Sequence, residues 1–184
     1  MANKVLYGLK NVYYSVLTEA ASDSYATPVA IPGAVSISLS PKGETTTLIA
    51  DDSEYWEDDS NEGYDGNLVI AALPEAFVTD VMGEVADKKD VVFEKSSAQP
   101  KPFALLFEFD GDANKVKHVL YKCKATRTNV EGKATTKKEV SPTTLNLRVR
   151  PNRAGYVKAK TKSNTDETVI ANWYTAVQTF VTGT

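Results

Sequence analysis

The sequence predicts a mainly β protein, an antiparallel β-sandwich or small β-barrel. Apolar and polar side chains alternate with a period of two in four windows, residues 35–39, 103–109, 119–125 and 143–150. A period of two is typical of half-buried strands. Turn-forming residues at 110–114 join the second window to the third, and helical periodicity is confined to two short stretches. We therefore expect an antiparallel sheet with one packed face and one face in water.

The apolar phase of these windows predicts which side chains of the sheet lie in its core. Alternation places consecutive residues on opposite faces, so the apolar set of each window belongs to one face. The inward-facing residues that we expect are Val35, Ile37 and Leu39; Phe103, Leu105, Phe107 and Phe109; Val119, Tyr121, Cys123 and Ala125; and Leu145, Leu147 and Val149.

The segment 110–114, Asp-Gly-Asp-Ala-Asn, predicts an antiparallel hairpin between two of these strands. Its acidic and amide side chains at every second position are also the pattern that opens a calcium-binding loop. Such a loop needs Gly at its sixth position and a bidentate Glu at its twelfth, where this chain has Lys115 and Tyr121. We interpret the segment as a plain turn without a metal ion.

Two short helices are expected beside the sheet. The first spans 74–83, where Pro occupies the first turn, Phe77 and Val81 are four residues apart, and Gly83 ends the helix. The second spans 166–181, after an acidic start that suits a helix N-terminus. Each would lie against the sheet through one apolar stripe. In the second helix that stripe is Val169, Trp173, Val177 and Val181.

Residues 40–66 predict a long hairpin arm that projects from the body. This stretch mixes Thr, Ser, Gly and acidic residues, with an apolar trace at Leu48, Ile49, Tyr55 and Trp56. Connections this long inside a compact domain are usually functional or disordered. Tyr55 and Trp56 fit either the core of a two-stranded arm or an anchor that binds a partner, because an aromatic flanked by charges is typical of interface hot spots.

Charge is sorted along the chain, although the net charge is only −3. Residues 43–87 hold thirteen carboxylates and no Lys or Arg, and nine of the thirteen lie within 40–66. Residues 115–162 hold fourteen Lys and Arg against Glu131 and Glu139 alone. Two such segments attract each other, either within one molecule or between copies docked head to tail. Head-to-tail contacts between identical copies generate rings or open filaments.

Length and composition favour one domain that covers residues 1–184. We expect a soluble protein made in the cytoplasm, because the N-terminus has no apolar signal-peptide core and no apolar run approaches about 18 residues. A membrane partner is therefore not expected. With Cys123 as the single cysteine and His118 as the single histidine, neither an internal disulfide nor a Cys/His metal site is expected.

No catalytic or cofactor-binding constellation assembles in the sequence, so we expect neither an enzyme nor a bound cofactor. Any nucleophilic triad would require His118, which lies in the polar phase of a predicted strand. The glycines fit no phosphate-binding spacing. Paired carboxylates at Asp51-Asp52 and Asp58-Asp59 lack apolar cover that would raise one pKa for acid catalysis.

Two binding functions remain as alternatives. A monomeric β-sandwich that binds a sugar or peptide would use Tyr55, Trp56 and Tyr64 as a stacking surface. A nucleic-acid-binding domain would track phosphates with the basic segment, although an acidic pI near 5.3 and a single interleaved aromatic, Tyr156, argue against it. The candidate basic residues are Arg127, Lys133, Lys137, Lys138, Arg148, Arg150, Arg153, Lys158, Lys160 and Lys162.

Seven short segments, taken in their order, are more specific than composition. Together they extend over nearly the whole chain. They are Tyr-Gly-Leu-Lys-Asn-Val-Tyr-Tyr-Ser-Val-Leu-Thr (7–18), Pro-Gly-Ala-Val (32–35), Ala-Asp-Asp (50–52), Gly-Tyr-Asp-Gly-Asn-Leu (63–68), Gln-Pro-Lys-Pro-Phe-Ala-Leu-Leu-Phe-Glu-Phe-Asp-Gly (99–111), His-Val-Leu-Tyr (118–121) and Asn-Trp-Tyr (172–174).

This ordered series resembles the major tail proteins, or tail tube proteins, of long-tailed, non-contractile bacteriophages. The resemblance implies a single tail-tube domain with a flanking helix, which forms hexameric rings that stack into a hollow tube for genome delivery. It implies a place in the virion tail after assembly in the host cytoplasm. The implied partners are further copies of the chain, a tape-measure protein and tail-end proteins, with DNA passing through the lumen unbound. The chain ends without the immunoglobulin-like domain that some relatives carry, so a host-adhesion role is not expected.

The charge pattern and the resemblance together predict a subunit interface between the acidic arm and the basic segment of another copy. An antiparallel sheet with exposed edges also favours edge-to-edge closure between copies. The interface residues expected on the arm are Asp51, Asp52, Glu54, Tyr55, Trp56, Asp58, Asp59 and Glu62, and those facing them are Lys133, Lys137, Lys138, Arg148, Arg150 and Arg153.

Overall fold

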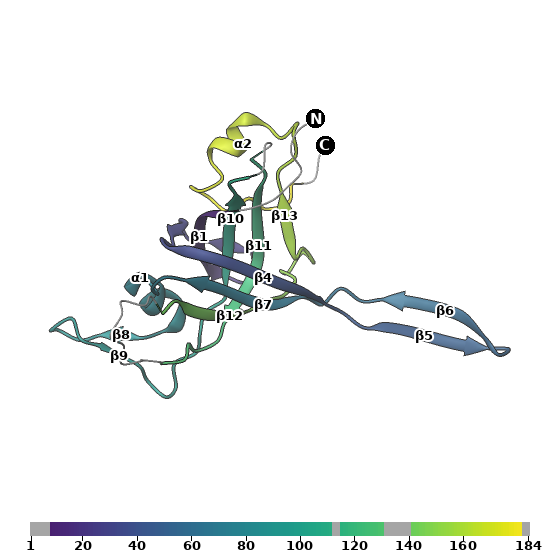
Figure 1. Ribbon diagram of the computed structural model, residues 1–184, viewed down its shortest axis with the longest axis horizontal. Coiled ribbons are helices and arrows are strands. Elements are labelled where there is room, and N and C mark those ends of the chain that lie inside the picture. The colour runs from purple at the N-terminus through teal and green to yellow at the C-terminus, as the bar shows by residue number, and fades with distance from the viewer. Residues whose placement is uncertain (1–7, 112–114, 131–140, 182–184) are drawn as a thin grey trace.

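The computed structural model describes residues 8–111, 115–130 and 141–181. Within these residues the fold is mainly β, so the predicted fold class is confirmed (Figure 1). A large antiparallel sheet consists of β1 (Leu9–Glu19), β2 (Ser24–Tyr25), β3 (Val29–Ala30), β4 (Ala34–Lys42), β7 (Gly63–Ile70), β10 (Phe103–Phe109), β11 (Lys117–Ala125), β12 (Thr143–Val149) and β13 (Lys158–Lys160).

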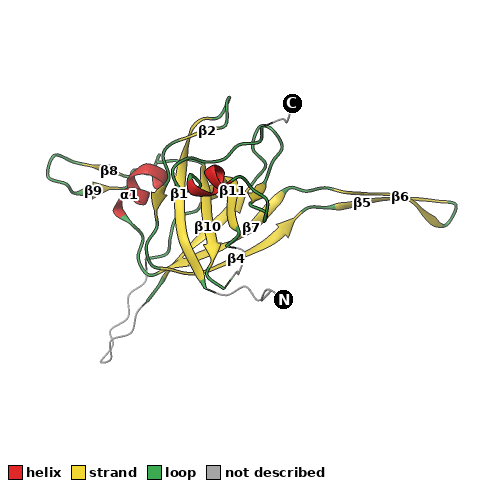
Figure 2. Ribbon diagram, turned by 90° about the horizontal axis from the view of Figure 1, so that it is seen from above, coloured by secondary structure: helices red, strands yellow, loops and turns green. Residues whose placement is uncertain are grey.

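The other elements lie around this sheet. A long hairpin is formed by β5 (Thr45–Ala50) and β6 (Ser53–Asp59), and a short one by β8 (Val85–Ala86) and β9 (Val92–Phe93). Figure 2 shows the two hairpins on opposite sides of the body. The helical elements of the described chain are α1 (Glu75–Phe77), the π-helix η1 (Val78–Met82) and α2 (Glu167–Ala171).

The sheet follows the order β2-β1-β10-β11-β12-β7-β4, with β13 paired to β11 and β3 to β1. It curls over on itself, so that β4 and β7 cross in front of β10 and β11 (Figure 1). The main core fills the space inside the curl, where Tyr14, Phe103, Leu68 and Leu145 are fully buried. The antiparallel pairing of β10 with β11 confirms the predicted hairpin.

The inward phases predicted for β10 and β12 are confirmed. The odd-numbered apolar residues of each strand belong to the main core cluster or pack against it. They are Phe103, Leu105, Phe107 and Phe109 in β10, and Leu145, Leu147 and Val149 in β12.

The phase predicted for β11 is only half right, because the strand contains a bulge. Lys122 has a positive φ of 43°, and the pairing of β11 with β10 shifts register beside it. A bulge inserts one extra residue and so exchanges the faces on its two sides. Val119 and Tyr121 therefore face away from the main core, while Leu120 and Cys123 face into it.

The predicted wet face of β10 is also wrong. Ala104 and Leu106, on the outer face of this strand, are fully buried in a second apolar cluster with Trp173. The C-terminal segment that follows β13 supplies this cover. A central strand that is buried on both faces has a nearly continuous apolar sequence, and the sequence of β10 is of this kind.

β4 departs from its predicted phase at its first residues. Val35 is 58% exposed, whereas Ala34 packs against the main core. The register of β4 against β7 shifts between Ala34 and Ser36, and this irregularity turns Val35 outward. Ile37 and Leu39 face the core as expected, but they remain half-buried.

The helix predicted at 74–83 is present as α1 followed by η1. Phe77 and Val81 are fully buried against the sheet. Gly83 ends the element in the left-handed region with φ 80°, and its N–H bonds to the carbonyl of Val78, five residues back. The sequence pattern located the element and its stop, but the wider π-helical turn was not predicted.

The C-terminal helix is shorter than the predicted span 166–181. In α2 the Asp166 carboxylate accepts a hydrogen bond from the Thr168 N–H at 2.8 Å and caps the first turn. The helix ends at Ala171 with Asn172 as its C-cap, and the following residues, Trp173 and Tyr174, both turn toward the sheet. Neighbouring residues of an α-helix do not share a face, so this contact requires the chain to leave the helix.

Candidate functional site

The hairpin arm is a continuation of the sheet and not a loose loop. β4 and β7 remain paired up to Lys42 and Gly63, so the ends of the predicted stretch 40–66 belong to the body. Beyond them the Glu62 N–H bonds to the Lys42 carbonyl, and the Ser60 N–H to the Glu44 carbonyl, both at 2.9 Å. At about 3.3 Å per residue the arm extends roughly 30 Å from Lys42 to its tip.

Two aspartates close the tip of the arm. Ala50 pairs with Ser53, so Asp51 and Asp52 form a two-residue turn. Their φ values of 53° and 56° are those of a type I′ turn, the form that matches the twist of paired strands. The two predicted interface residues of the tip therefore also shape it.

Apolar side chains of the arm remain exposed. Leu48 and Trp56 are cross-strand partners, yet they are 54% and 50% exposed. Ile49 and Tyr55, nearer the tip, are 71% and 74% exposed. A two-stranded ribbon offers no second layer to cover these side chains, so Tyr55 and Trp56 are not the core of the arm.

The carboxylates predicted for the interface surround these apolar residues. Asp59 accepts a hydrogen bond from the Thr45 hydroxyl at 2.5 Å, and Glu62 lies 3.7 Å from the Lys42 ammonium at the base of the arm. All six predicted acidic residues are exposed, namely Asp51, Asp52, Glu54, Asp58, Asp59 and Glu62.

Three of the six predicted basic residues, Arg148, Arg150 and Arg153, lie in the described chain. Arg150 is half-buried and bonds at 2.7 Å to Asp65, whose pKa it holds below the ordinary range of a carboxyl group. Arg148 and Arg153 are exposed. Lys133, Lys137 and Lys138, like the turn residues 112–114, lie outside the described residues. Part of the positive charge is thus neutralised within the molecule.

The outer face of β10 and β11 is closed by the C-terminal segment. Tyr174 stacks on Tyr13 with ring centroids 4.7 Å apart, and its hydroxyl donates to Glu108 at 3.1 Å. Glu108 also pairs with Lys117 at 3.3 Å, and the Trp173 indole N–H donates to the His118 carbonyl. This face is therefore already occupied by the chain itself.

The outer face of β12, β7 and β4 has no such cover among the described residues. Small polar side chains lie next to one another across the three strands. Asn146 of β12 pairs with Asn67 of β7, which pairs with Ser38 of β4. The charged residues here are Asp65 and Arg148, with Arg150 and Lys42 also close to Asp65. Arg150 pairs with Asp65 and Lys42 with Glu62, so the surface is polar and Arg148 adds one positive charge to it.

Two glycines allow the three strands to approach at this place. Gly63 has a φ of 109°, which a residue with a side chain rarely adopts. A Cβ at Gly66 would lie 1.9 Å from the Ser38 carbonyl oxygen on the neighbouring strand. No chemical role is predicted for this segment, and its glycines serve the close packing of the strands.

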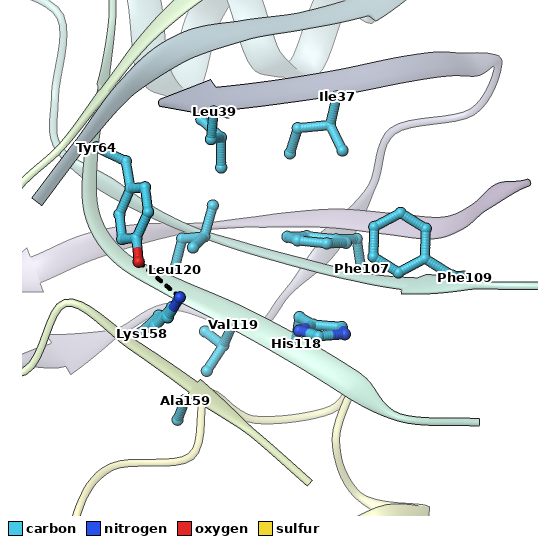
Figure 3. A pocket seen from close by; sticks show the side chains of 10 residues that line it. All are labelled: Ile37, Leu39, Tyr64, Phe107, Phe109, His118, Val119, Leu120, Lys158 and Ala159. Atoms are coloured by element: carbon cyan, nitrogen blue, oxygen red, sulfur yellow. Dashed lines mark hydrogen bonds between the residues drawn. The ribbon is translucent and has the colours of Figure 1, made fainter. Parts of the chain in front are cut away.

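An apolar groove opens between β4 and the pair β11 and β13 (Figure 3). Its volume is about 240 Å³. The Lys158 ammonium donates to the Tyr64 hydroxyl at 2.6 Å on its rim, and His118 stacks on Phe107 with centroids 5.2 Å apart. The residues that line the groove are Ile37, Leu39, Tyr64, Phe107, Phe109, His118, Val119, Leu120, Lys158 and Ala159.

Sequence reasoning missed this groove. Its lining comes from β4, β7, β10, β11 and β13, which only the curl of the sheet brings together. Ile37 and Leu39 were correctly placed on the inner face, but nothing local indicated that their ends would stay uncovered. The same holds for the β8–β9 hairpin, where Val85 and Phe93 are about half exposed.

The described residues contain no group of three or more His, Cys, Asp or Glu side chains arranged to hold a metal ion. Cys123 is fully buried, and burial raises the pKa of its thiol. No helix within these residues is long and apolar enough to span a membrane.

The residues of the sugar- or peptide-binding alternative are not assembled. Tyr64 lies in the body beside Lys158, whereas Tyr55 and Trp56 lie on the arm, so these three aromatics do not form one stacking surface. Among the basic residues, Arg127 is paired with Glu94 at 2.6 Å.

Comparisons with known proteins rest on structure alone. No protein-family model and no curated protein sequence matches this chain. Among solved structures, the chain is similar to one in the six-fold symmetrised cryo-EM structure of the anti-feeding prophage baseplate. The TM-score is 0.54 at 12% sequence identity, over 89% of this chain and 99% of the other. At this identity the match establishes a shared fold.

Proposed function

We propose that this protein is the major tail protein of a long-tailed, non-contractile bacteriophage, a structural subunit of hexameric rings that stack into a hollow tube for genome delivery. The observation that carries the proposal is the arm. It holds Leu48, Ile49, Tyr55 and Trp56 half to three-quarters exposed, away from the body. Large apolar side chains that are exposed on a projecting element favour a site of protein interaction.

Head-to-tail assembly follows from where the arm sits. The acidic arm and the basic residues of the body are different surfaces of one molecule, so a contact between them in two copies is heterologous. When such a contact is repeated around an axis, it closes a ring of copies. When it is repeated along the axis, it stacks one ring on the next. The fold shared with a chain of a six-fold symmetrised phage-like baseplate supports a ring of six.

The sheet supports the same arrangement through its edge. Along the described chain, β4 has a sheet partner on one side only, β7, although it is nine residues long. An exposed edge strand of this length favours pairing with another chain. Joining the edges of six copies into one barrel would leave no free edge.

The uncovered polar face of β12, β7 and β4 is the surface that we expect to line the lumen. Its Ser and Asn side chains carry no charge, Lys42 and Arg150 are paired with Glu62 and Asp65, and Arg148 adds one positive charge. DNA binding depends strongly on excess positive charge, so a lining with so few excess cations would hold passing DNA only weakly.

Deleting the arm tests the proposal. Residues 44–60 are replaced by Asn-Gly, which leaves β4 and β7 intact, and Thr47→Ser serves as a control that keeps the length, charge and apolar residues of the arm. We expect negative-stain electron microscopy to show rings or tubes for the wild type and the control, and a folded protein without tubes for the deletion. Normal tubes from the deletion would rule out the arm as the stacking element. Dispersed wild-type monomers under all conditions would overturn the function.

A further inference from the structure

We propose that the groove between β4 and β13 of one copy receives the apolar side chains of the arm of a second copy, with Trp56 as the inserted residue. The proposal rests on the proposed function, because it names the contact through which copies would bind. It concerns a site that comprises Ile37, Leu39, Tyr64, Phe107, His118 and Lys158 (Figure 3).

The groove has the size and chemistry for an aromatic side chain. A closed apolar cavity of about 150 Å³ binds benzene, and this groove is larger, at about 240 Å³. Leu39, Phe107 and Leu120 provide an apolar floor. Figure 3 shows these side chains converging from three strands on the same space, with Tyr64 and Lys158 at one side.

Charge favours the arm as the occupant. No carboxylate is among the residues that line the groove, while Lys158 carries a positive charge on its rim. Glu57 follows Trp56 directly, and Glu54 and Asp58 lie two residues to either side of it, so carboxylates would approach Lys158 when the indole is inserted. Opposite charges around an apolar anchor are the arrangement expected of a specific interface.

The other exposed apolar hairpin is less suitable. β8 and β9 carry Val85, Val92 and Phe93, but the turn between them holds Asp87, Lys88, Lys89 and Asp90 and has no net charge. Insertion of this hairpin would bring no excess negative charge toward Lys158. The arm of the same copy is also disfavoured, because its continuous ladder directs it away from the body (Figure 1).

Cysteine trapping in the full-length chain tests the contact. Cys123 is fully buried, so engineered cysteines provide the reactive thiols. Trp56→Cys and Leu39→Cys are made in separate chains and mixed under mild oxidation, so that any disulfide between them joins two copies. Thr47→Cys is the matched control, because Thr47 lies on the arm face opposite Trp56.

We expect the 56–39 pair to form a disulfide-linked dimer at least tenfold faster than the 47–39 pair. Rates that do not differ, in a protein whose wild type forms rings or tubes, would overturn the groove contact and leave the proposed function standing. If Phe93→Cys, and not Trp56→Cys, forms the disulfide with Leu39→Cys, the groove binds the short hairpin and the proposed contact with the arm is overturned. A wild type that neither assembles nor cross-links would overturn both proposals.

Lys158→Glu provides a second measurement that does not depend on cysteines. It places a negative charge where the acidic arm is expected, so assembly should require at least a tenfold higher protein concentration. Lys95→Glu, an equal charge change at an exposed position beside the short hairpin, should leave assembly unchanged. Equal effects of the two substitutions would contradict the proposal.

Discussion

Tyr14, Phe77 and Phe103 in the body are fully shielded from solvent and pack edge to face, with centroids 5.0 and 5.4 Å apart. In the arm, Leu48 and Trp56 also contact across two strands, yet about half of each remains exposed. The difference comes from layering. Side chains inside the curled sheet are covered from both sides, whereas a two-stranded ribbon covers only one. Body residues therefore stabilise the fold, and arm residues are available to bind.

The largest expected effect that tests this difference is on folding stability. Phe77→Ala removes a ring that contacts both Tyr14 and Phe103 and should lower the free energy of unfolding by about 3–5 kcal/mol. Trp56→Ala, an equally drastic truncation in the arm, should change it by less than about 0.5 kcal/mol. Both values come from urea unfolding followed by circular dichroism. A large loss of stability in Trp56→Ala would show that the arm packs on the body in solution.

A second effect appears only at alkaline pH. Burial raises the pKa of Tyr121 to about 12, and burial is also the main cause that raises the pKa of Tyr14, Tyr25 and Tyr174. Since these phenols ionise more easily in the unfolded chain, near pH 10, their contribution to stability is complete below pH 10 and is lost as the pH rises above it. We expect alkaline unfolding in which the absorbance of their phenolates develops together with the loss of near-UV circular dichroism.

Phenylalanine variants identify which tyrosines drive that transition. Tyr25→Phe removes one buried phenol, and the alkaline midpoint of unfolding should move to higher pH. Tyr55→Phe, in the arm, is the comparison variant and should leave the midpoint in place. Complete phenolate absorbance before any loss of tertiary signal would contradict the assignment of these tyrosines to the rigid body.

The smallest effect is expected at the tip of the arm. Gly adopts positive φ without steric cost, so Asp52→Gly should strengthen the type I′ turn, whereas Asp52→Val should weaken it. Hydrogen exchange of the amides of β5 and β6 should slow in the first variant and speed up in the second. The global free energy of unfolding should change by less than about 0.5 kcal/mol in both, because the tip contributes nothing to the core. A larger change would break the separation between arm and body.

The arm was largely predictable because its causes are local. Nine carboxylates without a cation in residues 43–66, few apolar residues and two strands of suitable length describe a projecting ribbon before any contact is known. Its boundaries were less accurate, since the pairing of Lys42 with Gly63 depends on β4 and β7 being neighbours in the sheet. The strand phases of β10 and β12 were predictable for the same local reason.

The remainder was not predictable, because it depends on segments that are distant in the chain. The bulge at Lys122 allows β11 to contribute Tyr121 to one cluster and Cys123 to the other. Trp173 ends a helix early in order to reach β10, about 70 residues before it. The predicted interface assigned Arg150 to a partner, but Asp65 on the adjacent strand already binds it.

By itself, the sequence determined a mainly antiparallel sheet, a short helix with its glycine stop, and an acidic arm, because alternation, capping and charge act between neighbours in the chain. The tertiary structure decided which face of the sheet is covered, where the bulges fall, and that an apolar groove beside Lys158 stays open. Those features depend on how far the sheet curls and on which surfaces the C-terminal segment covers. Burial is a property of whole surfaces, and no local pattern encodes it.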